Sequence, residues 1–443
     1  SGSLYSPSMS GGNLTFGGAG AIVNDGTLIY DIAGGAVHVN RTIGGLGTVS
    51  VTGNQSVHFA DGTTISTTGA QAYSATATGN RYHGFNLADN ASVALTSFGA
   101  ISMTGMLGTA NGHTGRLTIN TSAGNSDVTL NTPVGVSGVD YGLAELTVNA
   151  GTGAITLGTH NGQAWGTANT LSFTGGAVNA TANLNSFSTL TVTNSVGGTF
   201  SGVLSGSGSL TKAGIGTLTL TAHNGYAGGT NINAGTLNID VQGHQGASAV
   251  GVNKAVFVAS GATLRLNKTD GLGYYGANPS SLTIAGAMTI AAGIHSSIGN
   301  FGITLDGGTL TSEGSGSGSG NYILDGTMTT LANAASSVIS ANAIGLRNGS
   351  TSNQSVVFAV AVGAAATDLS VSSALNNGSG TNGLTKTGDG ELLLTGNSSY
   401  SGTTTIIAGT LKIGNGGSSG SLYSPSMSGG NLTFGGAGAI VND

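Results

Sequence analysis

The amino-acid sequence predicts an all-β protein of the β-solenoid class, in which short strands coil into an elongated rod. Three observations lead to this prediction: the composition, the alternation of apolar residues and the presence of internal repeats. Of 443 residues, 82 are Gly, 4 are Pro and only 6 % are charged. Collagen is excluded because Gly does not recur at every third position and Pro is scarce. Helical folds are disfavoured because Gly costs about 1 kcal/mol at a helical site.

Short runs of alternating apolar residues mark the expected strands. A period of two places one set of side chains on a buried face, and the intervening Gly, Asn, Asp and Ser residues favour turns. The inward-facing residues expected from this alternation are Leu28/Tyr30/Ile32, Val37/Val39, Val49/Val51, Val57/Phe59, Ile101/Met103, Leu117/Ile119, Leu146/Val148, Ile155/Leu157, Leu171/Phe173, Leu190/Val192, Leu218/Leu220, Leu264/Leu266, Ile303/Leu305, Val356/Phe358, Leu392/Leu394 and Leu411/Ile413.

Such thin strands suit a solenoid better than a sandwich, because each inward residue can stack on its equivalents in the coils above and below. Outward positions carry Thr, Ser and Asn, and few charges are expected because like charges would face each other about 4.8 Å apart. Roughly 20–25 residues per coil would give about 17–21 coils in 418 residues and a length of about 80–100 Å.

An exact repeat joins the two ends of the chain. Residues 1–25 and 419–443 are identical, at an offset of 418. We therefore expect residues 1–418 to be one solenoid repeat unit of a tandem array and residues 419–443 to be the start of the next identical unit. In such an array each coil templates the next.

A second repeat lies inside this unit. Residues 210–239 read LTKAGIGTLTLTAHNGYAGGTNINAGTLNI, and residues 384–413 read LTKTGDGELLLTGNSSYSGTTTIIAGTLKI. Both contain a Leu-Thr-Lys-x-Gly-x-Gly start, an alternating Leu strand, a Tyr-x-Gly-x-Thr turn and an Ala-Gly-Thr-Leu end. With their flanks, residues 206–240 and 380–414 resemble the passenger-associated transport repeat of bacterial autotransporters and large adhesins.

The resemblance implies a secreted passenger folded as a right-handed parallel β-helix on the outer surface of a Gram-negative bacterium. Neither a signal peptide nor a C-terminal membrane barrel is visible in the sequence, so the export route is not indicated. The absence of Cys agrees with a chain that crosses an outer-membrane pore unfolded, since no disulfide can stall it.

The charge balance excludes nucleic acid as a partner. Ten Lys and Arg against sixteen Asp and Glu give a net charge of −6, and the scattered cations cannot form the basic stripe that binds phosphates. No apolar run approaches the roughly 20 residues that span a bilayer as a helix, so we expect this segment not to span the membrane.

Several motifs resemble catalytic or ligand-binding sites, and in each case the structural interpretation is favoured. Gly271–Gly276 matches a dinucleotide fingerprint but lacks the following helix, and Gly416–Gly420 fits a nucleophile elbow without a strand-to-helix turn. The turn at 389–391 has two acidic residues. The His residues show no zinc-site spacing, although adjacent coils could bring them together; they are His38, His58, His83, His113, His160, His223, His244 and His295.

Two sets of outward polar or aromatic residues suggest binding surfaces. Thr-x-Thr triplets lie at 191–193, 217–221, 327–329 and 403–405, but they lack the constant spacing of an ice-binding face. Tyr5, Tyr82, Tyr226, Tyr274, Tyr275 and Tyr400 could stack on sugars. Tyr226 and Tyr400 occupy the same position in the two transport repeats, which favours a packing role.

We expect a structural or adhesive extracellular fibre segment, a tandem-repeat β-solenoid that forms a long surface filament or adhesin stalk and contributes to a biofilm or sheath. Its expected partners are the neighbouring identical repeat units, sister fibres and host or cell-surface glycans. The stalk could display a tip located elsewhere, or its own polar face could bind multivalently. The alternative is a polysaccharide-degrading parallel β-helix enzyme, but no acidic cluster with a basic residue is visible. We assign no catalytic, cofactor-binding or metal-binding residues, and expect no enzymatic activity.

Overall fold

The fold was analysed in a computed structural model of the chain. The residues that it describes are 22–414 with gaps at 25, 33–35, 41, 54–55, 76–83, 110–113, 135–141, 161–162, 167, 245–246, 252, 274–277, 299–300, 315–319 and 348–353, together with the strand residues 4–5, 14–16, 421–423, 425–427, 431–434 and 439–441. All secondary structure in this part of the chain is β-strand or turn, which confirms the predicted all-β class. The chain divides into unit 1 (Ser1–Ala227) and unit 2 (Gly228–Asp443).

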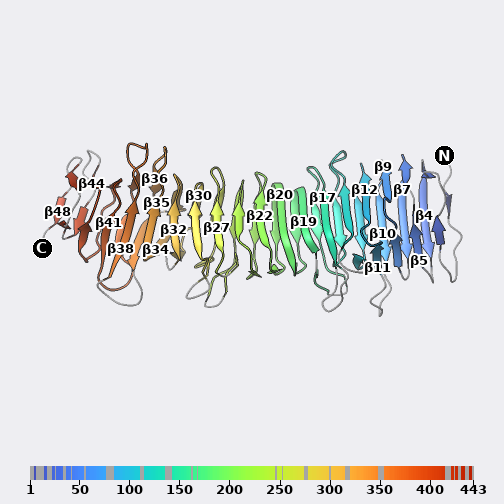
Figure 1. The fold of residues 1–443 in the computed structure, drawn as a ribbon, viewed down its shortest axis with the longest axis horizontal. Helices are drawn as coiled ribbons and strands as arrows, with labels where there is room; N and C mark the ends of the chain where they lie inside the picture. The colour runs from blue at the N-terminus through green and yellow to red at the C-terminus, as the bar shows by residue number, and fades with distance from the viewer. Residues whose placement is uncertain are drawn as a thin grey trace. The chain divides into compact units, whose positions relative to one another are not determined.

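The coils of unit 1 contribute strands to two long faces, and many of them also contribute a strand to a third face; strands on one face pair in parallel with those of the next coil (Figure 1). The first face contains β3 (Ile22–Val23), β6 (Ile43–Gly45), β9 (Thr64–Thr67), β12 (Ser92–Ser97), β15 (Arg116–Asn120), β17 (Leu143–Asn149), the first halves of β19 (Ala168–Ala180) and β20 (Phe187–Phe200), and β22 (Ser209–Ala213). The second face contains β1 (Leu4–Tyr5), β4 (Thr27–Ile32), β7 (Thr48–Gly53), β10 (Gln71–Ala75), β13 (Ile101–Thr104), β16 (Val128–Asn131), β18 (Ile155–Leu157), the second halves of β19 and β20, and β23 (Thr217–Leu220). The third face contains β2 (Leu14–Phe16), β5 (Ala36–Val39), β8 (Ser56–Phe59), β11 (Gly84–Leu87) and β14 (Leu107–Thr109), followed by β21 (Ser205–Gly206) and β24 (Gly225–Tyr226).

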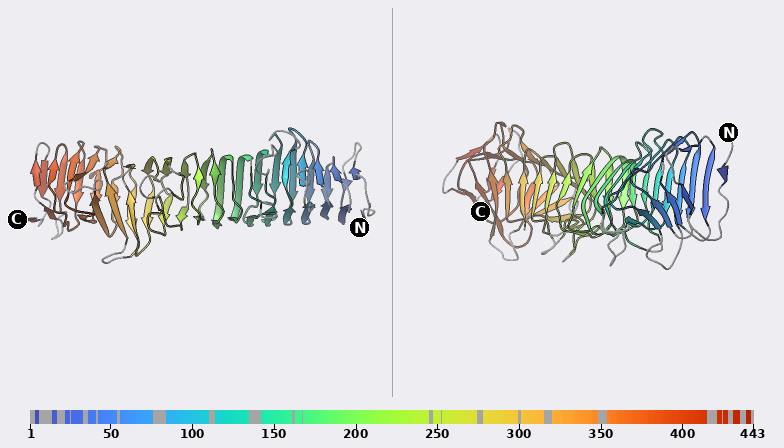
Figure 2. Two further views of the ribbon diagram at one scale, coloured as in Figure 1. Left: turned by 90° about the horizontal axis from the view of Figure 1, so that it is seen from below. Right: turned by 45° about the vertical axis from the view of Figure 1, so that its right-hand side comes forward.

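Unit 2 repeats this arrangement, and the views in Figure 2 show the same side-by-side stacking of strands within it. Its first face contains β25 (Thr230–Ile232), β27 (Ala255–Val258), β29 (Ser281–Ile284), β32 (Gly302–Leu305), β35 (Thr327–Thr330), β38 (Gln354–Val360), β41 (Asn382–Thr387), β43 (Thr404–Ile406) and β46 (Pro425–Met427). Its second face contains β26 (Thr236–Ile239), β28 (Thr263–Leu266), β30 (Ala287–Ile290), β33 (Thr309–Ser312), β36 (Ser337–Ile339), β39 (Leu369–Val371), β42 (Glu391–Leu394), β44 (Thr410–Ile413) and β47 (Asn431–Phe434). Its third face contains β31 (His295–Ile298), β34 (Asn321–Asp325), β37 (Ala343–Arg347) and β40 (Ala374–Asn377), and β45 (Ser421–Tyr423) pairs separately with β48 (Ala439–Val441).

Both units are therefore parallel β-solenoids, as the sequence predicted. The coils vary more in length than expected. Register partners lie only 19 residues apart at Leu394 and Ile413, but 32 residues apart at Ile339 and Val371. The strands of these coils keep similar lengths, so the difference lies in the corners and loops between them.

Ladders of identical or similar apolar side chains form the core. On the first face of unit 1, five leucines from consecutive coils lie in register and are buried: Leu117, Leu146, Leu171, Leu190 and Leu210. Burying one such side chain contributes about 1.5–3 kcal/mol. This ladder confirms the inward-facing assignment made from the alternating pattern.

Glycine allows the coils to approach closely at their corners. A Cβ atom at Gly47 would lie 1.7 Å from the carbonyl oxygen of Gly26, and one at Gly198 would lie 2.0 Å from that of Val178. Any larger residue at these positions must displace the backbone of the preceding coil. The packing of the stack thus requires Gly at these two positions.

The membrane prediction concerns helices only. Among the described residues, no helix has the length and apolarity needed to cross a bilayer.

The 25-residue duplication falls largely on residues outside those described, so the tandem-array interpretation of residues 1–418 and 419–443 stays a prediction.

Candidate functional site

The transport repeats place a lysine in the core of each unit. Lys212 on β22 continues the inward ladder of Phe173 and Val192, and its residue is 0 % exposed. Lys386 on β41 lies in register with Phe358 and is equally buried. An aliphatic stem of this length can pack against apolar neighbours while its ammonium group reaches a polar partner.

The ammonium group of each lysine caps the corner that follows its strand. Lys212 Nζ donates to the carbonyl oxygens of Ala213 (2.7 Å) and Gly214 (2.8 Å). Lys386 Nζ donates to those of Thr387 (2.9 Å) and Gly388 (2.6 Å), and also to that of Ala408. Both glycines have left-handed backbone, with φ of 74° and 73°, which favours Gly. The Lys-x-Gly part of the repeat is therefore a corner motif.

Burial lowers the pKa of Lys212 to about 8. It lowers the pKa of Lys386 to about 8 as well, against the opposing effect of the Asp389 and Asp368 carboxylates. An unfolded chain would hold these protons up to a pH of about 10.4. Between these two values the unfolded chain binds more protons than the folded chain, so stability should rise with pH.

We therefore expect the urea midpoint of the chain to increase between pH 8 and about pH 9.5. Burial raises the pKa of Tyr322 and Tyr400. Above about pH 10 the unfolded chain would therefore lose the protons of these tyrosines before the folded chain does, and the free energy of unfolding should fall again. In the Lys212→Met/Lys386→Met double variant the rise should disappear. Equal pH profiles for the wild-type and double-variant chains would contradict this assignment.

The matching tyrosines of the two repeats are packing residues, as predicted. Tyr226 is 1 % exposed and its ring lies 6.2 Å from that of Phe187. Tyr400 is fully buried and hydrogen bonds to the Thr404 hydroxyl. Neither is available to stack on a sugar.

The remaining motifs give no enzymatic constellation among the described residues. Gly271 and Leu272 lie in a turn, and the next described element is β29. Residues 274–276 of that motif and the whole of 416–420 lie outside the described part. Within the described residues, no group of three or more His, Asp or Glu side chains could hold a metal ion. Tyr5, Tyr82, His83 and His113 also fall outside the described side chains.

The fold brings together one pair of histidines that could not be predicted from their spacing in the sequence. His38 and His58 occupy neighbouring coils on the third face of unit 1, and their rings stack at 4.6 Å. His58 Nε2 also lies 2.9 Å from the Ser56 hydroxyl. Burial and the proximity of His38 lower the pKa of His58. With no third ligand among the described residues, the pair is a surface stack.

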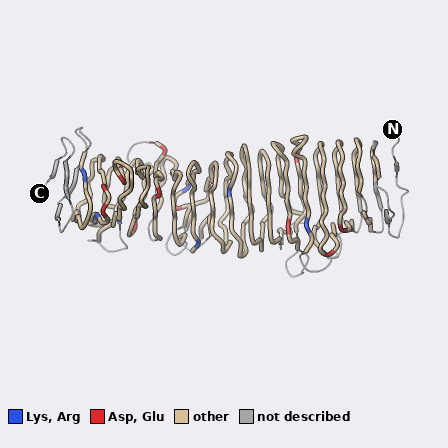
Figure 3. Tube along the Cα trace, turned by 45° about the horizontal axis from the view of Figure 1, so that its top comes forward, with Lys and Arg blue, Asp and Glu red and all other residues tan. Residues whose placement is uncertain are grey.

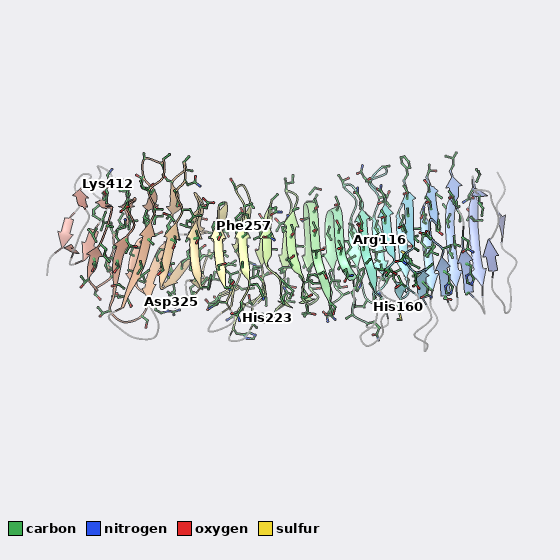
Figure 4. The ribbon with its side chains drawn as sticks, in the orientation of Figure 1. Arg116, His160, His223, Phe257, Asp325 and Lys412 are labelled. Carbon is green, nitrogen blue, oxygen red and sulfur yellow. The ribbon has the colours of Figure 1, made fainter. Side chains whose placement is uncertain are left out.

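Charged residues are sparse in both units (Figure 3), but two clusters occur in unit 2. Arg265 forms a bidentate ion pair with Glu313, and the Nε–Oε1 and Nη2–Oε2 distances are both 2.7 Å. The second cluster contains Arg347 and Asp325, the latter labelled in Figure 4, with a 2.7 Å ion pair and side chains that are 14 % and 4 % exposed. Each guanidinium thus lies in an ion pair with a carboxylate.

The Arg347–Asp325 pair lies beside a hollow on the third face of unit 2. Arg347 Nη2 lies 3.2 Å from the Ser297 hydroxyl, and the Ser297 backbone N–H donates to Asp270. The hollow has a volume of about 290 Å³ and is lined by His295, Asn321, Tyr322, Ile323, Ala343, Gly345, Asn376, Asn377 and Gly378. Of its lining residues only His295 was considered from the sequence, as a possible metal ligand, and the hollow itself was not predicted because the contacts cross coils of unequal length.

Exposed apolar side chains gather at one corner of each unit. Eight of the ten large apolar residues that are exposed in the described part lie at the corner between the first and second faces. Val23 ends β3, Val196 lies between the two halves of β20, and the other six lie between a first-face strand and the following second-face strand. They form what we term the apolar corner: Val23, Leu46, Phe98, Val196 and Ile215 in unit 1, and Leu331, Val362 and Ile407 in unit 2. These residues recur at the same corner of separate coils, and such a row is a candidate surface for contact with another chain.

Comparison with known proteins agrees with the fold and its repeats. The family model for the passenger-associated transport repeat matches residues 210–239 and 384–413, which confirms the repeats predicted at 206–240 and 380–414. The parallel solenoid and these repeats are those of an autotransporter passenger segment.

A curated relative supports the same class. The chain is 29% identical over 243 residues to the adhesin BmaC autotransporter of Brucella suis biovar 1, a match that covers 45% of this chain but only 7% of that adhesin. No solved structure matches the chain.

Proposed function

We propose that the chain is a segment of an adhesive stalk on the outer surface of a Gram-negative bacterium, and that it acts by binding. The observation that carries this proposal is the pair of transport repeats built into a parallel solenoid. The name of the similar protein, an autotransporter adhesin, supports it. A polar surface repeated coil after coil allows weak contacts to add up.

Two measurements test this proposal. Antibodies against the 443-residue chain should label intact cells that carry the parent protein, and beads coated with the chain should adhere to host cells more than albumin-coated beads. Unlabelled cells would contradict the surface location. Beads that adhere no better than albumin-coated beads would contradict an adhesive stalk and leave an inert one.

The proposal also includes the absence of enzymatic activity. In unit 2 both clustered arginines are engaged by carboxylates. Incubation with polygalacturonate or alginate should release no unsaturated sugar ends. Release of such products by the purified chain would support the alternative of a polysaccharide-degrading enzyme.

A second candidate partner is a sister copy of the same chain, because the apolar corner recurs in both units. We expect the chain to self-associate in sedimentation velocity, and replacement of Leu46, Phe98, Val196 and Ile215 by Ser to reduce this association strongly. The control replaces Phe257 and Val203, which are 38% and 37% exposed away from this corner. An equal loss in both variants, or no loss in either, would contradict a role of the apolar corner.

A further inference from the structure

The hollow on the third face of unit 2 has the features of a small binding site. Two small outward residues of β37, Ala343 and Gly345, lie next to the larger Asn321 and Ile323 of β34 and to Asn376 of β40. Its volume of about 290 Å³ is close to the lower end of ligand sites, about 300 Å³. We propose that this hollow binds an uncharged saccharide, which deepens the proposed adhesive function and rests on it.

Two amide groups at the hollow are oriented to donate hydrogen bonds. The Asn376 side-chain oxygen accepts a hydrogen bond from the Ser399 hydroxyl (2.8 Å), and the Asn321 oxygen accepts one from the Asn342 amide (3.3 Å). Each bond fixes its acceptor oxygen and leaves the NH₂ group of Asn321 or Asn376 without an acceptor among the described residues. Fixed amide donors are suited to the lone pairs of sugar hydroxyl groups.

The spacing of these donors fits more than one sugar ring. Asn321 on β34 and Asn376 on β40 are separated by β37, two strand spacings or about 10 Å across the strands, and are offset by two residues or about 7 Å along them, which places them about 12 Å apart. The small residues of β37 lie between them. A linear disaccharide or trisaccharide could therefore extend across the strands, with a ring over Ala343 and Gly345.

The lining of the hollow also includes aliphatic side chains. Ile323 is partly exposed there, and Ala343 is almost buried, at 9 %. A pyranose ring has one face formed mainly by C–H groups, and burying that face against apolar atoms is favourable. Polar donors beside apolar side chains are the usual combination in a ligand site.

The charges around the hollow favour an uncharged ligand. No Lys or Arg is among the lining residues, and the nearby Arg347 is paired with Asp325. The Asp270 carboxylate lies 4.0 Å from His295 Nε2 and accepts the Ser297 N–H. This local excess of carboxylate would repel a uronate, sulfate or phosphate group. A neutral sugar meets no such repulsion.

The test uses the whole 443-residue chain and four neutral probes: maltotriose, cellotriose, mannotriose and triacetylchitotriose. Trigalacturonate serves as the charged comparison. Binding is measured by saturation-transfer NMR and by calorimetric titration. We expect at least one neutral trisaccharide to bind with a Kd on the order of 1 mM, and trigalacturonate to bind more weakly.

Two variants locate the binding. Asn376→Ala removes a donor, and Ala343→Leu fills the hollow; each should weaken binding about tenfold or more. The matched control is Ala287→Leu, which changes an outward Ala on the second face of the same unit and should bind like the wild type. Far-UV circular dichroism melting verifies that each variant is folded, and Asn376→Ala alone suffices if Ala343→Leu does not fold.

Three results would overturn the inference: no binding of any neutral probe, tighter binding of trigalacturonate, or binding that neither variant weakens. The adhesion assay separates this failure from that of the proposed function. If the beads adhere although the chain binds no neutral trisaccharide, the saccharide site is contradicted and the adhesive function still stands. If the chain binds a saccharide but the beads do not adhere, the adhesive function is contradicted and the saccharide site still stands.

Discussion

Replacing Arg347 by Met is expected to lower the local stability of the third face of unit 2 by about 3–5 kcal/mol. Arg347 Nε and Nη2 both bind Asp325 Oδ2, at 2.8 Å and 2.7 Å, and the carboxylate is only 4 % exposed. Removing the guanidinium leaves this buried carboxylate without its cation. Native-state hydrogen exchange should therefore show a large loss of protection in β34 and β37, because a solenoid opens locally.

Two further variants distinguish ion-pair loss from general damage. Arg116→Met breaks a 3.8 Å pair with Glu145 whose side chains are 55% and 43% exposed, so a change of about 0–1 kcal/mol is expected. The Arg347→Met/Asp325→Leu double variant removes both charges and should recover much of the loss. Similar protection in Arg347→Met and wild type would refute the structural role of the pair.

The Gly198→Ala substitution is expected to destabilise unit 1 by about 3 kcal/mol, the upper end of the usual cost of overpacking. A Cβ atom at this position would lie 2.0 Å from the Val178 carbonyl oxygen in the preceding coil. Because backbone atoms cannot move aside as a side chain can, neighbouring coils must separate and strain their hydrogen bonds. Urea unfolding and hydrogen exchange of β19 and β20 measure the effect.

The matched control is Gly225→Ala in the same unit, where a Cβ atom would have no neighbour within 4 Å. This variant should stay within about 1 kcal/mol of the wild type, or gain slightly from the smaller entropy of the unfolded chain. Equal destabilisation by both substitutions would mean that Gly198 is required for another reason than the close approach of coils.

The alternating apolar pattern predicted which residues face inward, and every residue of the predicted set is buried except Tyr30 and Ile32, whose side chains lie outside the described part. The pairs Leu117/Ile119 and Leu146/Val148 lie in register and are buried. This prediction succeeds because a period of two has only one arrangement that buries the apolar set. The two transport repeats could also be predicted from the sequence, since each is a long motif with a fixed order of residues.

The hollow could not be predicted in this way. Its residues meet because Asn321 pairs in register with Ala343, and Ile323 with Gly345. The alternating pattern determines the facing of a side chain but leaves open how many residues a corner takes. Because the coil length varies from 19 to 32 residues, the sequence pattern does not predict which strands become neighbours.

The inward lysines show a different limit. Lys212 stands two residues after Leu210, at an inward position of the alternating pattern. A charged residue at an inward position normally indicates that the strand has ended. The exception is a lysine whose ammonium group can reach the carbonyl oxygens of a corner. That arrangement depends on the left-handed Gly214, whose conformation follows from the fold.

Cryo-electron microscopy of the native surface material tests most directly that this chain is one solenoid unit of a fibre. We expect continuous filaments with strands spaced by about 4.8 Å along the axis and a longer period of about 80–100 Å. Isolated globular particles without this spacing would contradict both the tandem array and the stalk.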